Sequence, residues 1–182
     1  LPSIIRMTNR VRISSLADEI WIATGRSKIN DELERMFKKT DIKVFRGDDS
    51  DVLSRYMEIT NSSKADIIVR LTGDCPLIDP SIIDQSIQLL LDKNVDYVSN
   101  IMNRTYPDGM DVEVFTKDAL QEASFKVEEK FSREHVTTYI HGIHKNKYKH
   151  GNFTKASLEY NVDFSHLRWT LDELKDLDFL NQ

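Results

Sequence analysis

The sequence predicts an α/β protein with a mostly parallel sheet, helices on both faces of that sheet and an antiparallel addition in the second half. Two patterns lead to this fold class. Through the first half, stretches with helical periodicity alternate with short β-branched apolar runs, as in sheets whose parallel strands are joined by right-handed crossovers. In the second half this alternation stops. No repeat, low-complexity stretch or Pro/Gly/Ser-rich linker divides the 182 residues, so we expect residues 1–182 to form one domain.

The clearest strand covers residues 67–71, a short and mostly apolar run of the kind that is covered on both faces. Gly73 and Pro76 break this run. Asp74 therefore lies just beyond the carboxyl end of a central strand, which is the edge where open α/β sheets bind their ligands.

The other elements of the first half follow from periodicity and from turn residues. Apolar residues at helical spacing predict a helix after Pro2, and polar caps at Ser50 or Asp51 and at Asp79 mark the starts of two more. In order, we expect a helix at residues 3–14, a strand at 19–23, a helix at 32–39, a strand at 42–45, a helix from 50 or 51 to 61, the strand at 67–71 and a helix at 80–92.

The second half is less regular. Residues 111–115 alternate acidic and apolar side chains, as a half-exposed strand does, and residues 103–109 are rich in turn residues. Residues 145–155 are polar and basic, which indicates a loop with a short strand near its end. The remaining elements are strands at residues 97–101 and 167–171 and helices at 117–128, 132–144 and 172–180.

Charge and cysteine content exclude several classes of protein. The net charge of −5 argues against a broad surface for nucleic acid or anionic membranes, and no apolar run reaches the length of a membrane span. The single cysteine, Cys75, excludes an internal disulfide framework and a cysteine-based zinc cluster, and it fits a reducing compartment. Because no base is evident beside Cys75, we interpret it as a packing residue. We expect a cytoplasmic protein with no nucleic-acid or membrane partner.

Acidic residues collect at the predicted ends of strands. Asp74 follows the central strand, Asp108 and Asp111 flank Gly109, and Asp172 follows the last strand. If these strand ends share one edge of the sheet, some of the carboxylates could converge on a magnesium ion. Waters and substrate phosphates would then complete the coordination shell of that ion. Such a site serves phosphoryl chemistry. A role as a turn residue is the alternative for each acid, and residues 170–173 (Thr-Leu-Asp-Glu) also match a capping box.

Five arginines and one histidine are candidates for contacting anionic groups, since arginine binds phosphate and carboxylate in a bidentate manner. A plain surface arginine is the alternative in each case. On a helix, His135 shares a face with Ser132 and Tyr139, which indicates either a substrate-contacting face or an amphipathic helix with a half-buried histidine. The arginine candidates are Arg46, Arg70, Arg104, Arg133 and Arg168.

Several motifs occur in the order in which a known family has them. Residues 68–80 read Ile-Val-Arg-Leu-Thr-Gly-Asp-Cys-Pro-Leu-Ile-Asp-Pro, and residues 104–115 read Arg-Thr-Tyr-Pro-Asp-Gly-Met-Asp-Val-Glu-Val-Phe. Shorter motifs are Phe-Arg-Gly (45–47), Asp-Val-Leu-Ser-Arg-Tyr (51–56), Asp-Tyr-Val-Ser-Asn (96–100), Arg-Glu-His-Val-Thr (133–137) and His-Leu-Arg-Trp-Thr-Leu-Asp (166–172). Together these motifs resemble the SpsF-type cytidylyltransferases, the spore-coat-polysaccharide relatives of the CMP-KDO and CMP-sialic acid synthetases.

The resemblance implies a Rossmann-like nucleotide-diphospho-sugar transferase fold and a magnesium-dependent reaction. A sugar hydroxyl would attack the α-phosphate of CTP, giving a CMP-sugar and pyrophosphate. The sugar would be acidic or modified and would serve a surface polysaccharide or glycoconjugate. A homodimer is also implied.

The same resemblance assigns roles to individual residues. Asp74 and Asp172 would bind magnesium and act in catalysis. The residues implied to line the nucleotide pocket are Thr24, Arg46, Arg70, Thr72 and Gly73. Those implied to face the sugar are Asn100, Arg104, Asp108, Asp111, Arg133 and His135.

One part of the family pattern is missing. Family members begin with a strand and a loop rich in Arg, Ser, Gly and Lys that holds the triphosphate, whereas residues 2–11 resemble the helix after that loop. A cradle of backbone N–H groups and basic side chains is not readily replaced from elsewhere in a chain. We therefore expect the single domain to be incomplete at its N-terminus, with a degenerate relative as the alternative.

Two other function classes stay open. One is a non-catalytic relative that binds a nucleotide or a partner chain. The other is a glycosyltransferase of the similar GT-A fold, which would need an Asp-x-Asp pair after a central strand. Asp49-Ser50-Asp51 has this spacing, but we interpret it as a helix start with Ser50 or Asp51 as the cap.

Overall fold

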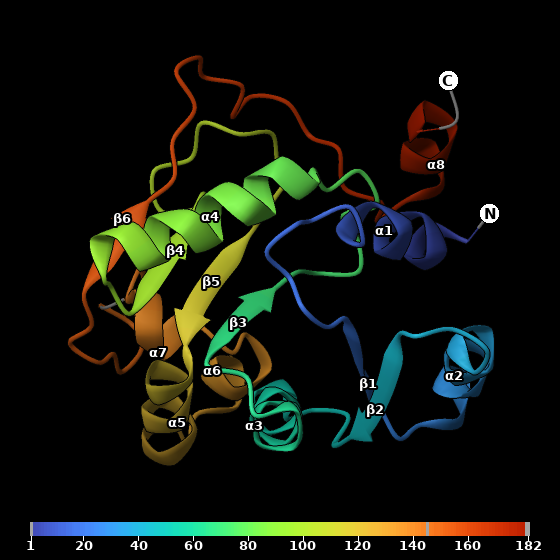
Figure 1. Ribbon diagram of the computed structural model, residues 1–182, viewed down its shortest axis with the longest axis horizontal. Helices are drawn as coiled ribbons and strands as arrows, with labels where there is room; N and C mark the ends of the chain where they lie inside the picture. Colours follow the sequence, from blue (N-terminus) through green and yellow to red (C-terminus); the bar gives the residue numbers. More distant parts are fainter. Residues whose placement is uncertain (1, 145, 181–182) are drawn as a thin grey trace. The chain divides into compact units, whose positions relative to one another are not determined.

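The chain forms two compact units in a computed structural model that describes residues 2–144 and 146–180 (Figure 1). The first unit contains residues 2–18, 69–115 and 154–180. The second contains residues 19–68 and the described part of 116–153. Within these described ranges, no helix is long and apolar enough to cross a membrane. The single domain that the sequence predicts would comprise both units, and it stays a prediction.

The first unit is built on a sheet with both parallel and antiparallel pairs. Two of its strands cross the boundary of the unit: β3 begins two residues before it and β5 ends one residue after it. The middle strand β4 (Tyr97–Ser99) runs antiparallel to β5 and parallel to β6, so the predicted antiparallel addition is confirmed. The strand order is β3 (Ile67–Arg70), β5 (Glu113–Thr116), β4 and β6 (Lys155–Ser157).

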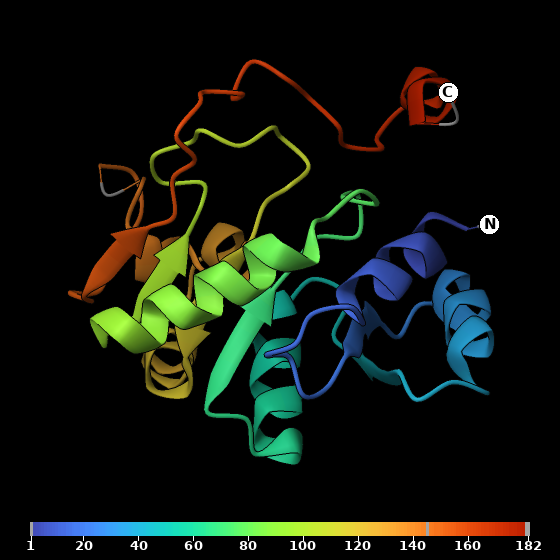
Figure 2. The same cartoon turned by 45° about the horizontal axis from the view of Figure 1, so that its top comes forward.

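Helix α4 (Pro80–Lys93) covers this sheet by packing on β4 and β6, and Figure 2 shows it in front of the strands. It begins as predicted, because the Asp79 side chain accepts a hydrogen bond from the Ser81 amide at 2.8 Å and Pro80 occupies the first turn. Its buried face consists of Ile82, Ile83, Ser86, Ile87 and Leu90.

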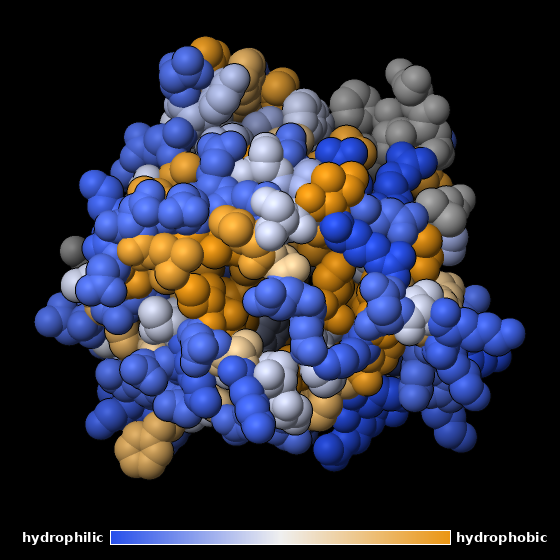
Figure 3. Space-filling view, viewed as in Figure 1, coloured by the Kyte–Doolittle hydropathy of each residue, from blue (hydrophilic) through white to orange (hydrophobic). Residues whose placement is uncertain are grey.

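Leu91 does not belong to that face. It is 52% exposed, and Figure 3 shows apolar surface over α4. Helical spacing of the apolar residues over 80–92 places Leu91 on the inner face beside Leu90, and this expectation is wrong. Each residue turns a helix by about 100°, so the residue after Leu90 points away from the sheet that Leu90 contacts.

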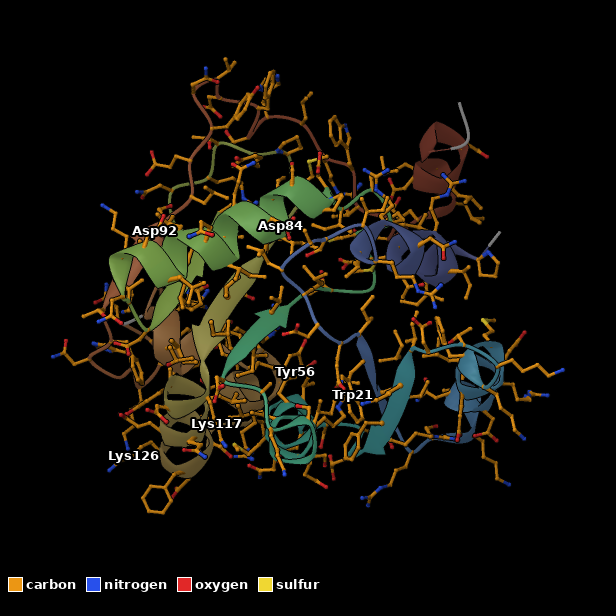
Figure 4. The ribbon with its side chains drawn as sticks, in the orientation of Figure 1. Trp21, Tyr56, Asp84, Asp92, Lys117 and Lys126 are labelled. Atoms are coloured by element: carbon orange, nitrogen blue, oxygen red, sulfur yellow. The ribbon has the colours of Figure 1, made fainter. Side chains whose placement is uncertain are left out.

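Helix α1 (Ser3–Val11) packs on α4 and is shorter than predicted. The segment after it is attached to α4 by the carboxylate of Asp84 (Figure 4). This carboxylate accepts hydrogen bonds from the hydroxyls of Ser14 and Ser15 and from the main-chain amides of Ser15 and Leu16. The amides of Ser15 and Leu16 therefore bond to a side chain of α4 instead of continuing α1.

The second unit begins with two parallel strands, β1 (Trp21–Gly25) and β2 (Lys43–Gly47). Trp21 projects from β1 in Figure 4 and lies under the ammonium group of Lys43, whose Nζ is 4.9 Å from the indole centroid. Helix α3 (Val52–Ser63) packs on both strands. The other helices of this unit are α2 (Asp31–Phe37), α5 (Lys117–Lys126), α6 (Lys130–Glu134), α7 (Thr138–His141) and the 3-10 turn η1 (Lys28–Asn30).

The single helix predicted over residues 132–144 is wrong, because α6 and α7 are separated at Val136. This buried residue has a φ of 58°, a left-handed conformation that interrupts helical hydrogen bonding. The amide of Thr137 bonds instead to the carbonyl of His135 at 2.6 Å. The hydrophobic spacing correctly predicted that residues on either side of Val136 are helical, but it did not indicate the break at Val136.

Two strand predictions also need correction. Residues 167–171 form one parallel bridge, between Arg168 and Asp108, and no strand. The predicted half-exposed strand at 111–115 begins at Glu113, and its residues Glu113, Val114 and Phe115 are all buried. β5 has a strand on each side in the sheet order, so alternation of acidic and apolar residues did not indicate exposure here.

Candidate active site

The turn that carries Asp74 follows β3 and is closed by its own main chain. The amide of Cys75 donates to the carbonyl of Thr72 at 3.2 Å, and the Thr72 hydroxyl lies 3.2 Å from the Cys75 sulfur. Gly73 is exposed, and a side chain there would meet no atom within 4 Å. Asp74 is half-buried. The turn thus presents an acid beyond the end of β3, as predicted. The expectation that this strand is central is wrong, because β3 stands at the end of the order of the described strands.

A main-chain hydrogen bond joins this turn to the segment that carries Asp172. The amide of Leu171 donates to the carbonyl of Asp74 at 2.8 Å. The two residues predicted to bind magnesium therefore come from adjacent stretches of backbone, although 98 positions separate them in the sequence.

The loop with Asp108 holds the same C-terminal segment from its other side. The Asp108 amide donates to the Leu167 carbonyl at 2.9 Å, and the Trp169 amide donates to the Asp108 carbonyl at 2.6 Å. Gly109 follows with a φ of 101°, and a Cβ there would lie 2.6 Å from the carbonyl carbon of Trp169. Only glycine permits both this conformation and this approach of two backbones.

Asn100 and Arg104 shape the loop from within. The buried Asn100 side chain donates to the Met110 carbonyl at 2.7 Å and accepts from the Val112 amide at 2.9 Å. Arg104 binds Asp111 in a bidentate manner, at 2.6 and 2.8 Å, and this hydrogen bonding raises the pKa of the guanidinium. Four of the residues predicted to face the sugar, Asn100, Arg104, Asp108 and Asp111, therefore lie in one loop, where Asn100 and the Arg104–Asp111 pair stabilise its shape.

Cys75 is buried in this region and behaves as the sequence predicts. Burial raises the pKa of its thiol to about 12, against a smaller opposing effect of the Thr72 hydroxyl, and the negative charges of Asp74 and Asp111 raise the pKa further. A raised pKa favours the protonated thiol at neutral pH, which is consistent with a packing role for Cys75.

Arg70, predicted to contact the nucleotide, forms an ion pair with the buried carboxylate of Glu113. Tyr97 donates its hydroxyl to the other oxygen of that carboxylate at 2.7 Å. Burial and the neighbouring Glu113 charge hold the pKa of the Tyr97 phenol well above its usual range. Sequence reasoning missed Glu113, because the acid was assigned to the open face of a strand.

Asp172 lies in a second cluster of charged side chains. Its Oδ2 atom accepts from Arg168 at 2.5 Å and from the Thr170 hydroxyl at 3.0 Å. Arg168 also binds Asp176, and this hydrogen bonding holds the pKa of the Asp176 carboxyl well below its usual range and raises the pKa of the Arg168 guanidinium. Asp176 was not a candidate from the sequence, and its spacing of eight residues from Arg168 did not indicate the pair.

The predicted capping box is displaced along the chain. Helix α8 (Leu174–Leu180) begins after Glu173, and Asp176 in its first turn accepts hydrogen bonds from the amides of Asp172 and Glu173. The expectation that residues 170–173 form the box is therefore wrong. Thr170 uses its hydroxyl on the Asp172 side chain and not on the amide of Glu173.

A magnesium ion in this region would take most of its ligands from water and substrate. Among residues 2–144 and 146–180 there is no group of three or more His, Cys, Asp or Glu side chains that could hold a metal by themselves. Magnesium in phosphate-transferring sites commonly takes one or two carboxylates and completes its shell with water and substrate phosphates. Asp74 and Asp172 carry one carboxylate each, and the bond from the Leu171 amide to the Asp74 carbonyl brings their segments together.

The remaining predicted site residues belong to the second unit. Thr24 on β1 and Arg46 on β2 are cross-strand partners, and Thr24 is buried. Arg46 directs its five N–H donors to the carboxylates of Asp31 and Glu34 and to three main-chain carbonyls between residues 25 and 27. A nucleotide phosphate would have to compete with these acceptors for Arg46.

Arg133 has a similar role in holding the second unit together. Its Nε donates to Asp51 at 2.7 Å, and its Nη1 donates to the carbonyls of Ser124 and Val127. Asp51 also caps α3 by accepting from the Ser54 amide, which confirms its interpretation as a helix cap. His135 is exposed, with its ring 4.2 Å from the ring of Phe131, so the half-buried alternative is wrong.

Comparison with known proteins identifies the family of this chain. A family model described as "Cytidylyltransferase" matches residues 2–176. An uncharacterized protein of Methanocaldococcus jannaschii is 36% identical over 174 residues, 93% of this chain and 67% of that protein. The spore coat polysaccharide biosynthesis protein SpsF of Bacillus subtilis is 36% identical over 139 residues, 74% of this chain and 57% of that protein. The 3-deoxy-manno-octulosonate cytidylyltransferase of Pelobacter propionicus is 36% identical over 91 residues, 50% of this chain and 35% of that protein.

Solved structures share the fold. A cytidylyltransferase from Leptospira borgpetersenii serovar Hardjo-bovis superposes with a TM-score of 0.89 at 31% identity, covering 98% of this chain and 73% of that one. A CMP:2-keto-3-deoxy-manno-octonic acid synthetase, complexed with CTP, gives a TM-score of 0.59 at 16% identity over 99% of this chain and 85% of that one. The predicted Rossmann-like nucleotide-diphospho-sugar transferase fold is thereby confirmed.

Proposed function

The chain belongs to the cytidylyltransferase family, and on this premise we propose that it transfers CMP from CTP to the hydroxyl of a sugar and releases pyrophosphate. The observation that carries the proposal is the main-chain hydrogen bond from Leu171 to Asp74. It joins two acid-bearing segments beyond the carboxyl end of β3, and the carboxyl ends of strands are where open α/β sheets bind their ligands.

The reaction would proceed by attack of the sugar oxygen on the α-phosphorus of CTP. The bond between this phosphorus and the oxygen bridging to the β-phosphate breaks, and pyrophosphate leaves. Catalysis of such a transfer consists mostly of positioning and of charge neutralisation. Asp74 and Asp172 would hold the magnesium ion, which when bound neutralises phosphate charge.

Two relatives support a sugar of a surface polysaccharide as the acceptor. One is named for spore coat polysaccharide biosynthesis and the other for 3-deoxy-manno-octulosonate. We propose an acidic or modified sugar, and the loop of Asn100, Arg104, Asp108 and Asp111 as its binding segment. We also propose a homodimer, which light scattering of the full-length protein tests directly.

The deciding experiment incubates the full-length protein with CTP, magnesium and a panel of acidic and neutral sugars, and follows pyrophosphate release. We expect release that requires both CTP and one class of sugar, and that is lost in Asp74→Asn. Absence of pyrophosphate with every sugar and nucleotide would favour a non-catalytic relative. Release of free nucleoside diphosphate with transfer of sugar would favour a glycosyltransferase. The helix-cap role of Asp51 in Asp49-Ser50-Asp51 already disfavours that second outcome.

A further inference from the structure

The carboxylate of Asp172 is held on one of its two oxygens. Oδ2 accepts from Arg168 Nη2 at 2.5 Å and from the Thr170 hydroxyl at 3.0 Å. The side chain is nevertheless 51% exposed. A carboxylate fixed in this way keeps its orientation while it stays open to solvent, which suits a ligand that binds a metal through its remaining oxygen.

The guanidinium of Arg168 is itself fixed by a second carboxylate, that of Asp176. Its Nη1 donates to Asp176 Oδ1 at 2.9 Å and its Nη2 to Asp176 Oδ2 at 3.2 Å. The Asp176 side chain is only 9% exposed, and its Oδ2 also accepts from the amides of Asp172 and Glu173. Asp176 is thus an anchor built into the start of α8, and it fixes the guanidinium beside Asp172.

This arrangement places a positive charge directly against one of the two carboxylates of the proposed metal site. A divalent cation that approaches Asp172 meets the attraction of the carboxylate and the repulsion of Arg168 together. The triphosphate of CTP would add several negative charges to the same place and reverse that balance.

We propose that Arg168 is a positioning residue that orients Asp172 and also screens it, so that the site binds a divalent cation well only together with the nucleotide. This inference rests on the proposed function, since it takes Asp74 and Asp172 as the metal ligands. Its benefit is an ordered assembly: metal and triphosphate enter as one complex, and a bare ion does not occupy the site alone.

If Arg168 only stabilised the start of α8, its removal would change the metal affinity in the opposite direction. Loss of that stabilisation would loosen Asp172 and weaken metal binding in every state. Loss of a screening charge instead strengthens metal binding in the absence of nucleotide, while the lost orientation of Asp172 slows turnover. The two roles of Arg168 therefore predict opposite changes in metal affinity without nucleotide, and a measurement of this affinity distinguishes them.

The test is a titration of the full-length protein with Mn²⁺ alone, followed by the electron paramagnetic resonance signal of the free ion. We expect Arg168→Gln to bind Mn²⁺ on the order of tenfold more tightly than the wild type, because a unit charge a few ångströms from a divalent ion has about this effect in a solvated site. Arg168→Lys retains the charge and should restore weak binding. Arg168→Met, which keeps the aliphatic stem, is a second charge-free variant in case Arg168→Gln does not fold.

Two controls isolate Asp172 and the charge. Lys175→Gln removes one positive charge from a 71% exposed side chain that pairs with Glu173, and it should leave Mn²⁺ affinity unchanged. The double variant Arg168→Gln/Asp172→Asn should lose the gain. Unchanged or weaker Mn²⁺ binding in folded Arg168→Gln and Arg168→Met would overturn the inference, as would an equal gain in Lys175→Gln.

The metal titration does not depend on turnover, so the two proposals can fail separately. Pyrophosphate release by the wild type, with no change of Mn²⁺ affinity in Arg168→Gln, would remove the inference and leave the function. Tighter Mn²⁺ binding in that variant, with no pyrophosphate release from any substrate, would remove the function and leave the screening of Asp172 by Arg168.

Discussion

The carboxylate of Glu113 accepts a hydrogen bond from the hydroxyl of Tyr97 at 2.7 Å. The Glu113 side chain is 3% exposed and forms an ion pair with Arg70. Removing one member of a buried pair leaves the other charge without compensation. We expect Glu113→Gln to lower the free energy of unfolding by about 3 kcal/mol. Urea denaturation followed by circular dichroism measures this change.

Tyr97→Phe is the matched control for that variant, because it removes one hydroxyl and keeps the ring. A single hydrogen bond to a charged acceptor contributes less, so a loss of about 1.5 kcal/mol is expected. Equal losses in Glu113→Gln and Tyr97→Phe would show that the ion pair with Arg70 adds nothing to stability.

Gly109→Ala should disturb the connection between the Asp108 loop and the C-terminal segment. The new methyl group would lie 2.6 Å from the carbonyl carbon of Trp169, and the φ of 101° is unfavourable for alanine. We expect a loss on the order of 3 kcal/mol in thermal or urea unfolding. Gly73→Ala has open space around its Cβ and should unfold like the wild type.

Asp74→Asn keeps the size of the side chain and leaves the main-chain bond from Leu171 in place. We expect turnover to fall by at least about a hundredfold, the scale on which removing a group that stabilises charge in the transition state acts. The melting temperature should change little. Pyrophosphate release at a near-normal rate would contradict the assignment of Asp74 as a metal ligand.

Cys75 predicts a specific dependence of stability on pH. Its folded pKa is raised to about 12 from an ordinary value of 9.0, so the protonated thiol is favoured in the folded state. The stabilisation is fully present below pH 9 and is lost as the pH rises towards 12, by up to about 1.4 kcal/mol per pH unit. Cys75→Ala should lack this component. Parallel curves of unfolding free energy against pH for the two proteins would refute the shift.

The sequence predicted the parts of the fold that depend on local signals. Asp79 followed by Pro80 marked the start of α4, and Asp51 marked the start of α3; both side chains accept an amide hydrogen bond as caps. These positions were predictable because capping involves residues two or three positions apart. The position of Asp74 after β3 was also predictable from local residues, because Gly73 and Pro76 end the apolar run of the strand.

Features that depend on distant partners were not predictable from periodicity. Glu113 was expected on an exposed face, and only the fold brings Arg70 and Tyr97 to it. Val136 breaks a regular helical pattern with a left-handed φ that no neighbouring residue signals. The use of Asp176 as the anchor for Arg168 depends on where α8 begins, which a capping pattern one turn earlier concealed.

The division into two units has a consequence for how the protein can be dissected. The chain crosses between them after residues 18, 68, 115 and 153, and two of these crossings fall inside β3 and β5. Neither unit is encoded by one continuous stretch of gene, so no single cut of the chain separates one whole unit from the other. Folding must therefore close long loops before either unit is complete, which favours slow folding governed by contacts between sequence-distant residues.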